Sequence, residues 1–277
     1  MANLRIVYDN AAARTSSIVA SSTAGTLTTA NLMSDRKSEV WRSTSTSATL
    51  TVTFTSSENV ACVALPFCNL TSLATIRVRA YTNTGDPTPI VDTGSVLAAP
   101  SSLGGTLDWG NLPFGVNAFS YGGYTYADAW FGVVAVRKIV IDLVDSTNPA
   151  GYIECAKLVA GNYWSPVYNA PVGARMAVEE TSKHDRTDAG DLMTDRGVMY
   201  KSLSIDLVYM PTLDRDYAWR ILRGNGMGKP VYVSVMPDST DVSEEQIFQI
   251  YGKLSKNSSL VYQLMNQYST SLQIDEA

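Results

Sequence analysis

Apolar and polar residues alternate along several short stretches of the first 166 residues. In Leu50 to Phe54, the residues Leu50, Val52 and Phe54 point one way and the threonines between them point the other. This period of two is the pattern of a half-buried β-strand. Val60 to Leu65 is continuously apolar, as a strand covered on both faces would be. The pattern therefore predicts a sheet with a covered face.

Matching strands occur on both sides of a long irregular stretch. Leu4 to Tyr8 and Ala74 to Tyr81 come before it, and Arg137 to Val144 and Tyr152 to Ala160 come after it. Strands that bracket a long insertion in this way are typical of antiparallel sandwiches. We therefore expect a β-sandwich over residues 1–167.

The second part of the chain mixes strands with one helix. Prolines and glycines cluster near Val167 to Gly173, which indicates a domain boundary. Leu213, Tyr217 and Ile221 are spaced by four, which predicts a helix that starts at Pro211 and Thr212 and ends at Gly224 to Gly226. We expect strands on both sides of it, including Ser202 to Tyr209 and Gln246 to Leu254. Thr181 to Gly197 is polar and is expected to form a loop or a solvent-facing arm.

The expected fold is therefore mainly β. It has an N-terminal jelly-roll β-sandwich at residues 1–167 and a smaller α+β domain with one helix at residues 168–277.

Composition and charge exclude several classes of function. Of the 277 residues, 45% are hydrophobic and 17% are charged, and the formal net charge is -5. The basic residues are scattered, so no nucleic-acid partner is expected. No apolar run is long enough for a membrane span, and no signal peptide is evident. Cys62, Cys68 and Cys155 form no CxxC pair, so neither a disulfide framework nor a zinc site is expected. These features fit a protein made in a reducing cytoplasm.

Catalytic signatures are scarce, and we expect no enzyme, no cofactor and no metal. His184 is the single histidine and stands among charged residues in a polar stretch, where a solvated cluster is the simpler interpretation. A glycosidase needs two facing carboxylates, for which Asp108 and Asp128 are the candidates. Nothing in the sequence indicates that either one is buried or paired.

Aromatic residues gather where the strand pattern fails, between residues 92 and 132. Either these rings plug one end of the sandwich, or they form a contact surface for a sugar or a neighbouring protein. The candidate binding residues are Trp109, Tyr121, Tyr124, Tyr126 and Trp130.

Three segments carry a family resemblance. Asp35 to Ser43 (DRKSEVWRS), followed by the strands Leu50 to Phe54 and Val60 to Leu65, resembles the discoidin or galactose-binding-like jelly roll. Gly151 to Pro166 is similar to the final strand of that fold as found in tail proteins of tailed bacteriophages. Ser202 to Pro237 is similar to phage tail and baseplate components.

The resemblance implies a non-enzymatic structural component of a phage tail or baseplate. Such a protein is made in the bacterial host cytoplasm, resides in the virion tail, and assembles as a homo-oligomeric ring with other tail proteins. The alternative is a carbohydrate-binding or host-receptor-binding module that recognises a surface glycan. A glycan hydrolase that uses Asp108 or Asp128 is a third hypothesis. Fold alone does not decide among them.

Overall fold

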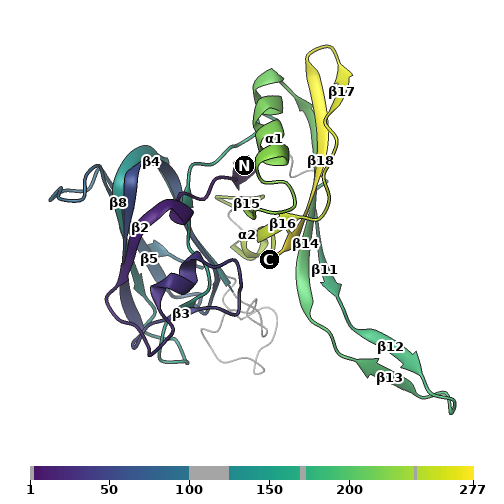
Figure 1. Cartoon of the computed structure of the whole chain (residues 1–277), viewed down its shortest axis with the longest axis horizontal. Coiled ribbons are helices and arrows are strands. Elements are labelled where there is room, and N and C mark those ends of the chain that lie inside the picture. Colours follow the sequence, from purple (N-terminus) through teal and green to yellow (C-terminus); the bar gives the residue numbers. More distant parts are fainter. Residues whose placement is uncertain (1–2, 100–124, 169–172, 240–241) are drawn as a thin grey trace.

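The computed structural model describes residues 3–99, 125–168, 173–239 and 242–277. Two β-structures stand side by side, and a narrow hairpin projects from the second one into solvent (Figure 1). The predicted mainly β fold with an N-terminal β-sandwich is confirmed.

The sandwich is one rolled nine-stranded sheet in the order β3-β9-β4-β8-β5-β6, with β2 and β10 on β4 and β7 on β5. Its strands are β2 (Thr15–Ala20), β3 (Trp41–Arg42), β4 (Ser47–Cys68), β5 (Thr75–Tyr81), β6 (Val91–Asp92), β7 (Val96–Leu97), β8 (Thr125–Val144), β9 (Glu154–Cys155) and β10 (Val159–Gly161).

The long strands β4 and β8 pair antiparallel and run through both layers. Register shifts between Thr53 and Glu58 and between Val60 and Cys62 let β4 bend. The two strands predicted at Leu50 to Phe54 and Val60 to Leu65 are therefore parts of one strand. Leu50, Val52 and Phe54 are buried in the sandwich core, as their alternation predicted.

The second sheet has seven strands in the order β1-β15-β16-β18-β14-β11, with β17 on β18. Its strands are β1 (Arg5–Val7), β11 (Arg175–Glu180), β14 (Met199–Met210), β15 (Val231–Ser234), β16 (Gln249–Leu254), β17 (Val261–Leu264) and β18 (Gln267–Glu276). The helix α1 (Thr212–Gly224) packs on this sheet through Ala218, Ile221 and Leu222, and it confirms the predicted helix.

The start of the chain belongs to the second sheet. Strand β1 pairs with β15, and Ile6 exchanges two backbone hydrogen bonds with Trp164, of 2.8 and 2.9 Å. The first strand was predicted, but its partner lies more than 220 residues away and left no local signal. The chain thus enters and leaves the sandwich through the second sheet.

Two strand predictions were wrong in detail. The segment Gln246 to Leu254 is not one strand: α2 (Val242–Ile247) covers its start, and Glu244 and Glu245 suit the first turn of a helix. Tyr152 to Ala160 is broken into β9 and β10. The break includes Lys157, which lies in neither strand. Its ammonium group donates hydrogen bonds to Met33 O and Asp35.

A buried carboxylate fastens α1 to the segment that leaves the sandwich. Asp214 is 3% exposed and accepts hydrogen bonds from Trp164 Nε1 at 3.0 Å and from the Val167 backbone N–H at 2.8 Å. The Trp164 ring also stacks on Tyr217 of α1, at 6.0 Å between ring centroids. The helix is therefore held to the connection between the two sheets.

Asp214→Ala should lower the free energy of unfolding by about 2–4 kcal/mol, because it leaves the buried Trp164 Nε1–H and the partly buried Val167 N–H without an acceptor. Denaturant unfolding measures this loss. The control is Asp216→Ala on the same turn, whose exposed carboxylate pairs with Arg215 and is worth less than about 1 kcal/mol. Equal midpoints for the two variants would contradict this account of the connection.

Candidate functional site

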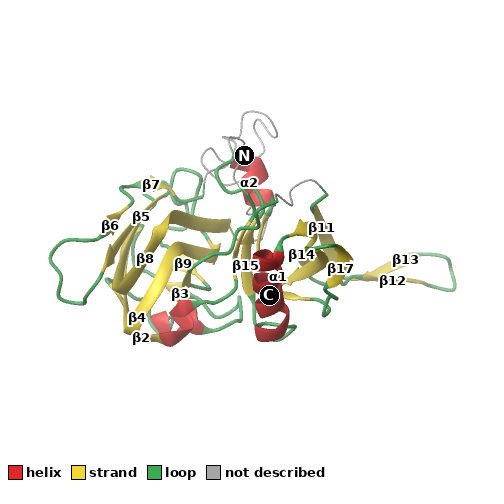
Figure 2. Cartoon of the chain, turned by 90° about the horizontal axis from the view of Figure 1, so that it is seen from above, coloured by secondary structure: helices red, strands yellow, loops and turns green. Residues whose placement is uncertain are grey.

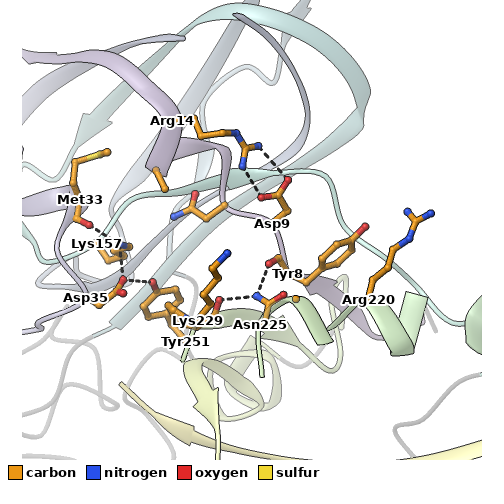
Figure 3. Close-up of a pocket in the computed structure, with 14 residues that line it drawn as sticks. Tyr8, Asp9, Arg14, Met33, Asp35, Lys157, Arg220, Asn225, Lys229 and Tyr251 are labelled. Carbon is orange, nitrogen blue, oxygen red and sulfur yellow. Dashed lines mark hydrogen bonds and ion pairs between the residues drawn. The ribbon is translucent and has the colours of Figure 1, made fainter. Parts of the chain in front are cut away.

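A charged cleft lies between the sandwich and α1 (Figure 3). Its volume is about 600 Å³. One wall comes from the segment after β1 and from the sandwich, and the other comes from the C-terminal end of α1 and the turn after it. The lining residues are Tyr8, Asp9, Asn10, Ala13, Arg14, Met33, Asp35, Lys157, Arg220, Gly224, Asn225, Lys229, Pro230 and Tyr251.

The sandwich wall of the cleft is built from ion pairs. Arg14 donates to Asp9 at 2.7 Å and to Glu58 at 2.9 Å, and these hydrogen bonds, that to Glu58 first, raise the pKa of Arg14. Lys157 Nζ lies 2.8 Å from Asp35 Oδ1, which also accepts from Tyr251 Oη at 3.0 Å. Burial alone would raise the pKa of Asp35, but the bond and charge of Lys157 lower it overall.

The helix wall carries two cationic side chains, and unlike those of the sandwich wall they are not held in ion pairs with any described residue. Arg220 and Lys229 are exposed, and within the described residues neither side chain forms an ion pair. The Arg220 guanidinium lies 5.5 Å from the centroid of the Tyr217 ring. Asn225 Nδ2 donates to Tyr8 O at 2.6 Å and so fastens the turn to the chain after β1. The cleft is thus lined by four cations and two carboxylates.

The predicted aromatic residues fall into two groups. Trp109, Tyr121 and Tyr124 lie outside the described residues. Tyr126 is 1% exposed, and its hydroxyl donates to Glu276 at 2.7 Å. Trp130 is half-buried and stacks on Tyr232 of the second sheet at 6.0 Å between centroids. These two rings fill space between the sheets, and the binding role of the whole set stays a prediction.

The sheets meet in a buried cluster that we call the joint. Its rings are Phe67 and Tyr126 from the sandwich and Tyr232 and Tyr251 from the second sheet, each at most 2% exposed. The ring centroids of Phe67 and Tyr126 are 5.6 Å apart, and those of Tyr126 and Tyr232 are 6.4 Å apart. The apolar residues around them are Val7, Val40, Cys62, Ala64, Ala156 and Val159.

Asp128 lies at the edge of the joint and receives three hydrogen bonds on one oxygen. Tyr232 Oη donates at 2.8 Å, Trp130 Nε1 at 2.9 Å and Gln249 Nε2 at 3.1 Å. Burial raises the pKa of Asp128 from 3.8 to about 6 despite these donors. Asp108, the other carboxylate of the hydrolase hypothesis, lies outside the described residues. In the described structure Asp128 connects the two sheets.

The polar stretch predicted as a loop or an arm is a hairpin arm, which we define as residues 181–198. Its strands β12 (Lys183–Arg186) and β13 (Leu192–Asp195) pair only with each other. Every arm residue except Ser182 is exposed. His184 lies here, with its Nδ1 at 3.0 Å from Thr194 Oγ1. Figure 2 shows the arm extending away from the body of the molecule.

Other chemistry is limited in the part of the chain that the structure describes. No group of three or more His, Cys, Asp or Glu side chains there could hold a metal ion. Within the same residues, no helix is long and apolar enough to cross a bilayer. Cys62, Cys68 and Cys155 are buried free thiols.

The cleft was missed at the level of sequence because its lining comes from five separate segments. One signal was present. Lys157 interrupts an apolar run, and a buried lysine requires a partner. That partner, Asp35, lies 122 residues away, and no local pattern connects the two.

Of the comparisons with known proteins, only the comparison with solved structures found matches. No protein-family model matches the sequence, and no curated protein matches it. One similar structure is chitosan-binding module 1 of a chitosanase/glucanase from Paenibacillus sp. IK-5, with 14% identity, a TM-score of 0.37, and 56% of this chain and 99% of that chain covered.

Two further structures are carbohydrate-binding modules of the type named CBM32. CBM32-3 of a family 31 glycoside hydrolase from Clostridium perfringens has 11% identity and a TM-score of 0.38, with 56% of this chain and 93% of that chain covered. CBM32 of AlyQ, in complex with 4,5-unsaturated mannuronic acid, has 13% identity and a TM-score of 0.35, with 53% and 94% covered. Likeness at this level carries no argument about what this chain does.

The unfolding free energy should depend on pH through Asp128. A folded-state pKa of about 6 against an ordinary 3.8 means that this group contributes most stability below pH 3.8. About 3 kcal/mol of that contribution is lost as pH rises through 6. Asp128→Asn cannot ionise, so the stability of the wild type relative to this variant should fall between about pH 4 and pH 7.

Denaturant unfolding at a series of pH values measures this difference. Asp188→Asn, at an exposed aspartate of the arm, should keep the wild-type profile. A constant difference between the wild type and Asp128→Asn across the series would show that folding does not raise the pKa of Asp128.

Proposed function

We propose that this chain is a non-enzymatic assembly protein whose copies join through the arm at residues 181–198. The single observation that carries the proposal is the exposure of that arm. A two-stranded hairpin that packs on nothing is at best marginally stable in water. Such an element gains stability when a partner covers it, which makes it a means of association.

The composition of the arm suits self-association. Leu192, Met193 and Val198 are 55%, 60% and 69% exposed, so the arm offers apolar surface. Charges of both signs lie between them, with Lys183 opposite Asp195 in the hairpin register. Two arms related by a two-fold axis could place apolar residues together and match charges of opposite sign.

The more specific proposal is that this protein belongs to the tail or baseplate of a bacteriophage. It rests on the sequence resemblance at Gly151 to Pro166 and Ser202 to Pro237. The solved structures described above are named for carbohydrate binding and not for tail assembly. Electron microscopy of purified particles with an antibody against this chain tests the placement. Absence of label from tails would reject it.

Removal of the arm should abolish self-association and leave the fold intact. The variant deletes residues 183–196 and carries Ser182→Asn, so that Thr181 and Val198 are joined by Asn-Gly, a favoured two-residue hairpin turn. We expect concentration-dependent oligomers for the wild type and a monomer for the variant, measured by light scattering after size exclusion. The unfolding midpoints should agree, because the arm covers no core.

A milder variant separates a specific contact from a general loss of apolar surface. Leu192→Asp with Met193→Asp should also give a monomer. The matched control is Met265→Asp, at a methionine that is 85% exposed in the β17–β18 turn, and it should keep the oligomers. A wild type that stays monomeric at all concentrations, or deletion variants that still associate, would reject the proposal.

The second candidate function is glycan binding by the aromatic stretch at residues 109–130. The observation that favours it is the density of Trp and Tyr residues there, since such rings suit sugar contacts. The similar structures are named as binding modules for chitosan and other saccharides, which is consistent with this candidate.

Trp109→Ala should abolish binding on a glycan array if this second candidate is right. Trp219→Ala is the control, because that exposed tryptophan on α1 lies outside the aromatic stretch. Binding that survives Trp109→Ala, or no binding by the wild type, would reject this candidate.

A further inference from the structure

The charges that line the cleft do not balance. The carboxylates of Asp9 and Asp35 are already engaged by Arg14 and Lys157 on the sandwich wall. Across the cleft, Arg220 and Lys229 meet no carboxylate among the described residues. The cleft therefore keeps a positive wall in a chain whose formal net charge is -5. A cleft with one sign of charge concentrates ligands of the opposite sign.

The rest of the lining is suited to hydroxyl groups. The Asp35 side chain is 42% exposed, and its carboxylate receives two hydrogen bonds, from Lys157 and Tyr251. A carboxylate has about four acceptor positions, so it can accept further hydrogen bonds from a ligand. The half-buried ring of Tyr8 lies between the side chains of Lys229 and Arg220, as Figure 3 shows. An aromatic ring beside acceptors and donors is a surface that a sugar ring can lie on.

We propose that this cleft binds an acidic saccharide. The carboxylate of the sugar acid lies along the wall that carries Arg220 and Lys229, its ring lies against Tyr8, and its hydroxyls donate to Asp35. A volume of about 600 Å³ is within the range of small-ligand pockets and accommodates a short oligosaccharide. This function is additional to assembly through the arm.

An acidic peptide is the competing occupant. The positive wall would attract it equally, but Asp35 would repel a second carboxylate, and the donors that such a peptide offers are its backbone N–H groups. A sugar acid brings one carboxylate together with several hydroxyl donors. The two kinds of group in the cleft therefore favour the saccharide.

Calorimetric titration of the full chain tests the proposal with four probes. Trigalacturonate and sialyllactose are the acidic probes, lactose is the neutral one, and tetraglutamate is the peptide. Binding of at least one acidic saccharide, with lactose about tenfold weaker or worse, is expected. Its affinity should fall as salt rises from about 50 to 300 mM, because the attraction is between exposed charges.

Arg220→Gln with Lys229→Gln should weaken that binding at least about tenfold, because charge-assisted hydrogen bonds to the carboxylate are lost. Arg223→Gln is the matched control: it removes a basic, exposed residue of the same helix that does not line the cleft. The three substitutions are at exposed positions, so all variants should unfold at the same midpoint.

Three outcomes would overturn the proposal. They are the absence of binding by both acidic saccharides at millimolar concentration, equal binding of lactose, and binding that the double variant leaves unchanged. Binding of tetraglutamate alone would identify an acidic peptide as the occupant instead. The oligomer mass of the same variants is also measured, so that the two proposals are tested separately. Failure of the cleft proposal would leave the arm-dependent association unchanged.

Discussion

The burial of aromatic rings between the two sheets is the interaction on which the rest of the structure depends. Phe67 and Tyr126 from the sandwich face Tyr232 and Tyr251 from the second sheet, and none is more than 2% exposed. Aromatic pairs of this kind contribute about 0.5–1.5 kcal/mol each beyond the area that they bury. Phe67 has a left-handed backbone, with φ at 58°, which is uncommon for a bulky residue. The packing of its ring in the joint offsets that local cost.

The joint determines where both candidate surfaces lie. Because β1 is an edge strand of the second sheet, the segment after it passes between the sheets and forms one wall of the cleft. The Asp214 contacts hold α1 to the same connection and so position the opposite wall. The arm continues from the paired strands β11 and β14 of the second sheet (Figure 1). This pairing holds the two ends of the arm in register.

Local pattern predicted the elements well and their long-range pairing poorly. Alternation at Leu50 to Phe54 and the four-residue spacing in α1 identified a strand face and a helix, because each signal is complete within a few residues. The partner of β1 and the split at Lys157 depend on contacts more than 100 residues away, which no local pattern records. The same limit of local pattern explains which parts of the candidate site could be predicted from the sequence. The arm is one continuous segment and was predicted as a loop or an arm, whereas the cleft and the position of Asp128 arise only when the sheets meet.

Hydrogen exchange as a function of protein concentration tests the central claim, that the arm is an exposed element completed by another copy. The account predicts that amides of residues 183–195 exchange nearly unprotected in dilute solution, since an uncovered hairpin opens readily. They should become protected at concentrations where oligomers form, while the amides of β4 and β8 exchange slowly throughout. Arm amides that are strongly protected in the monomer, or that stay unprotected in the oligomer, would contradict the account.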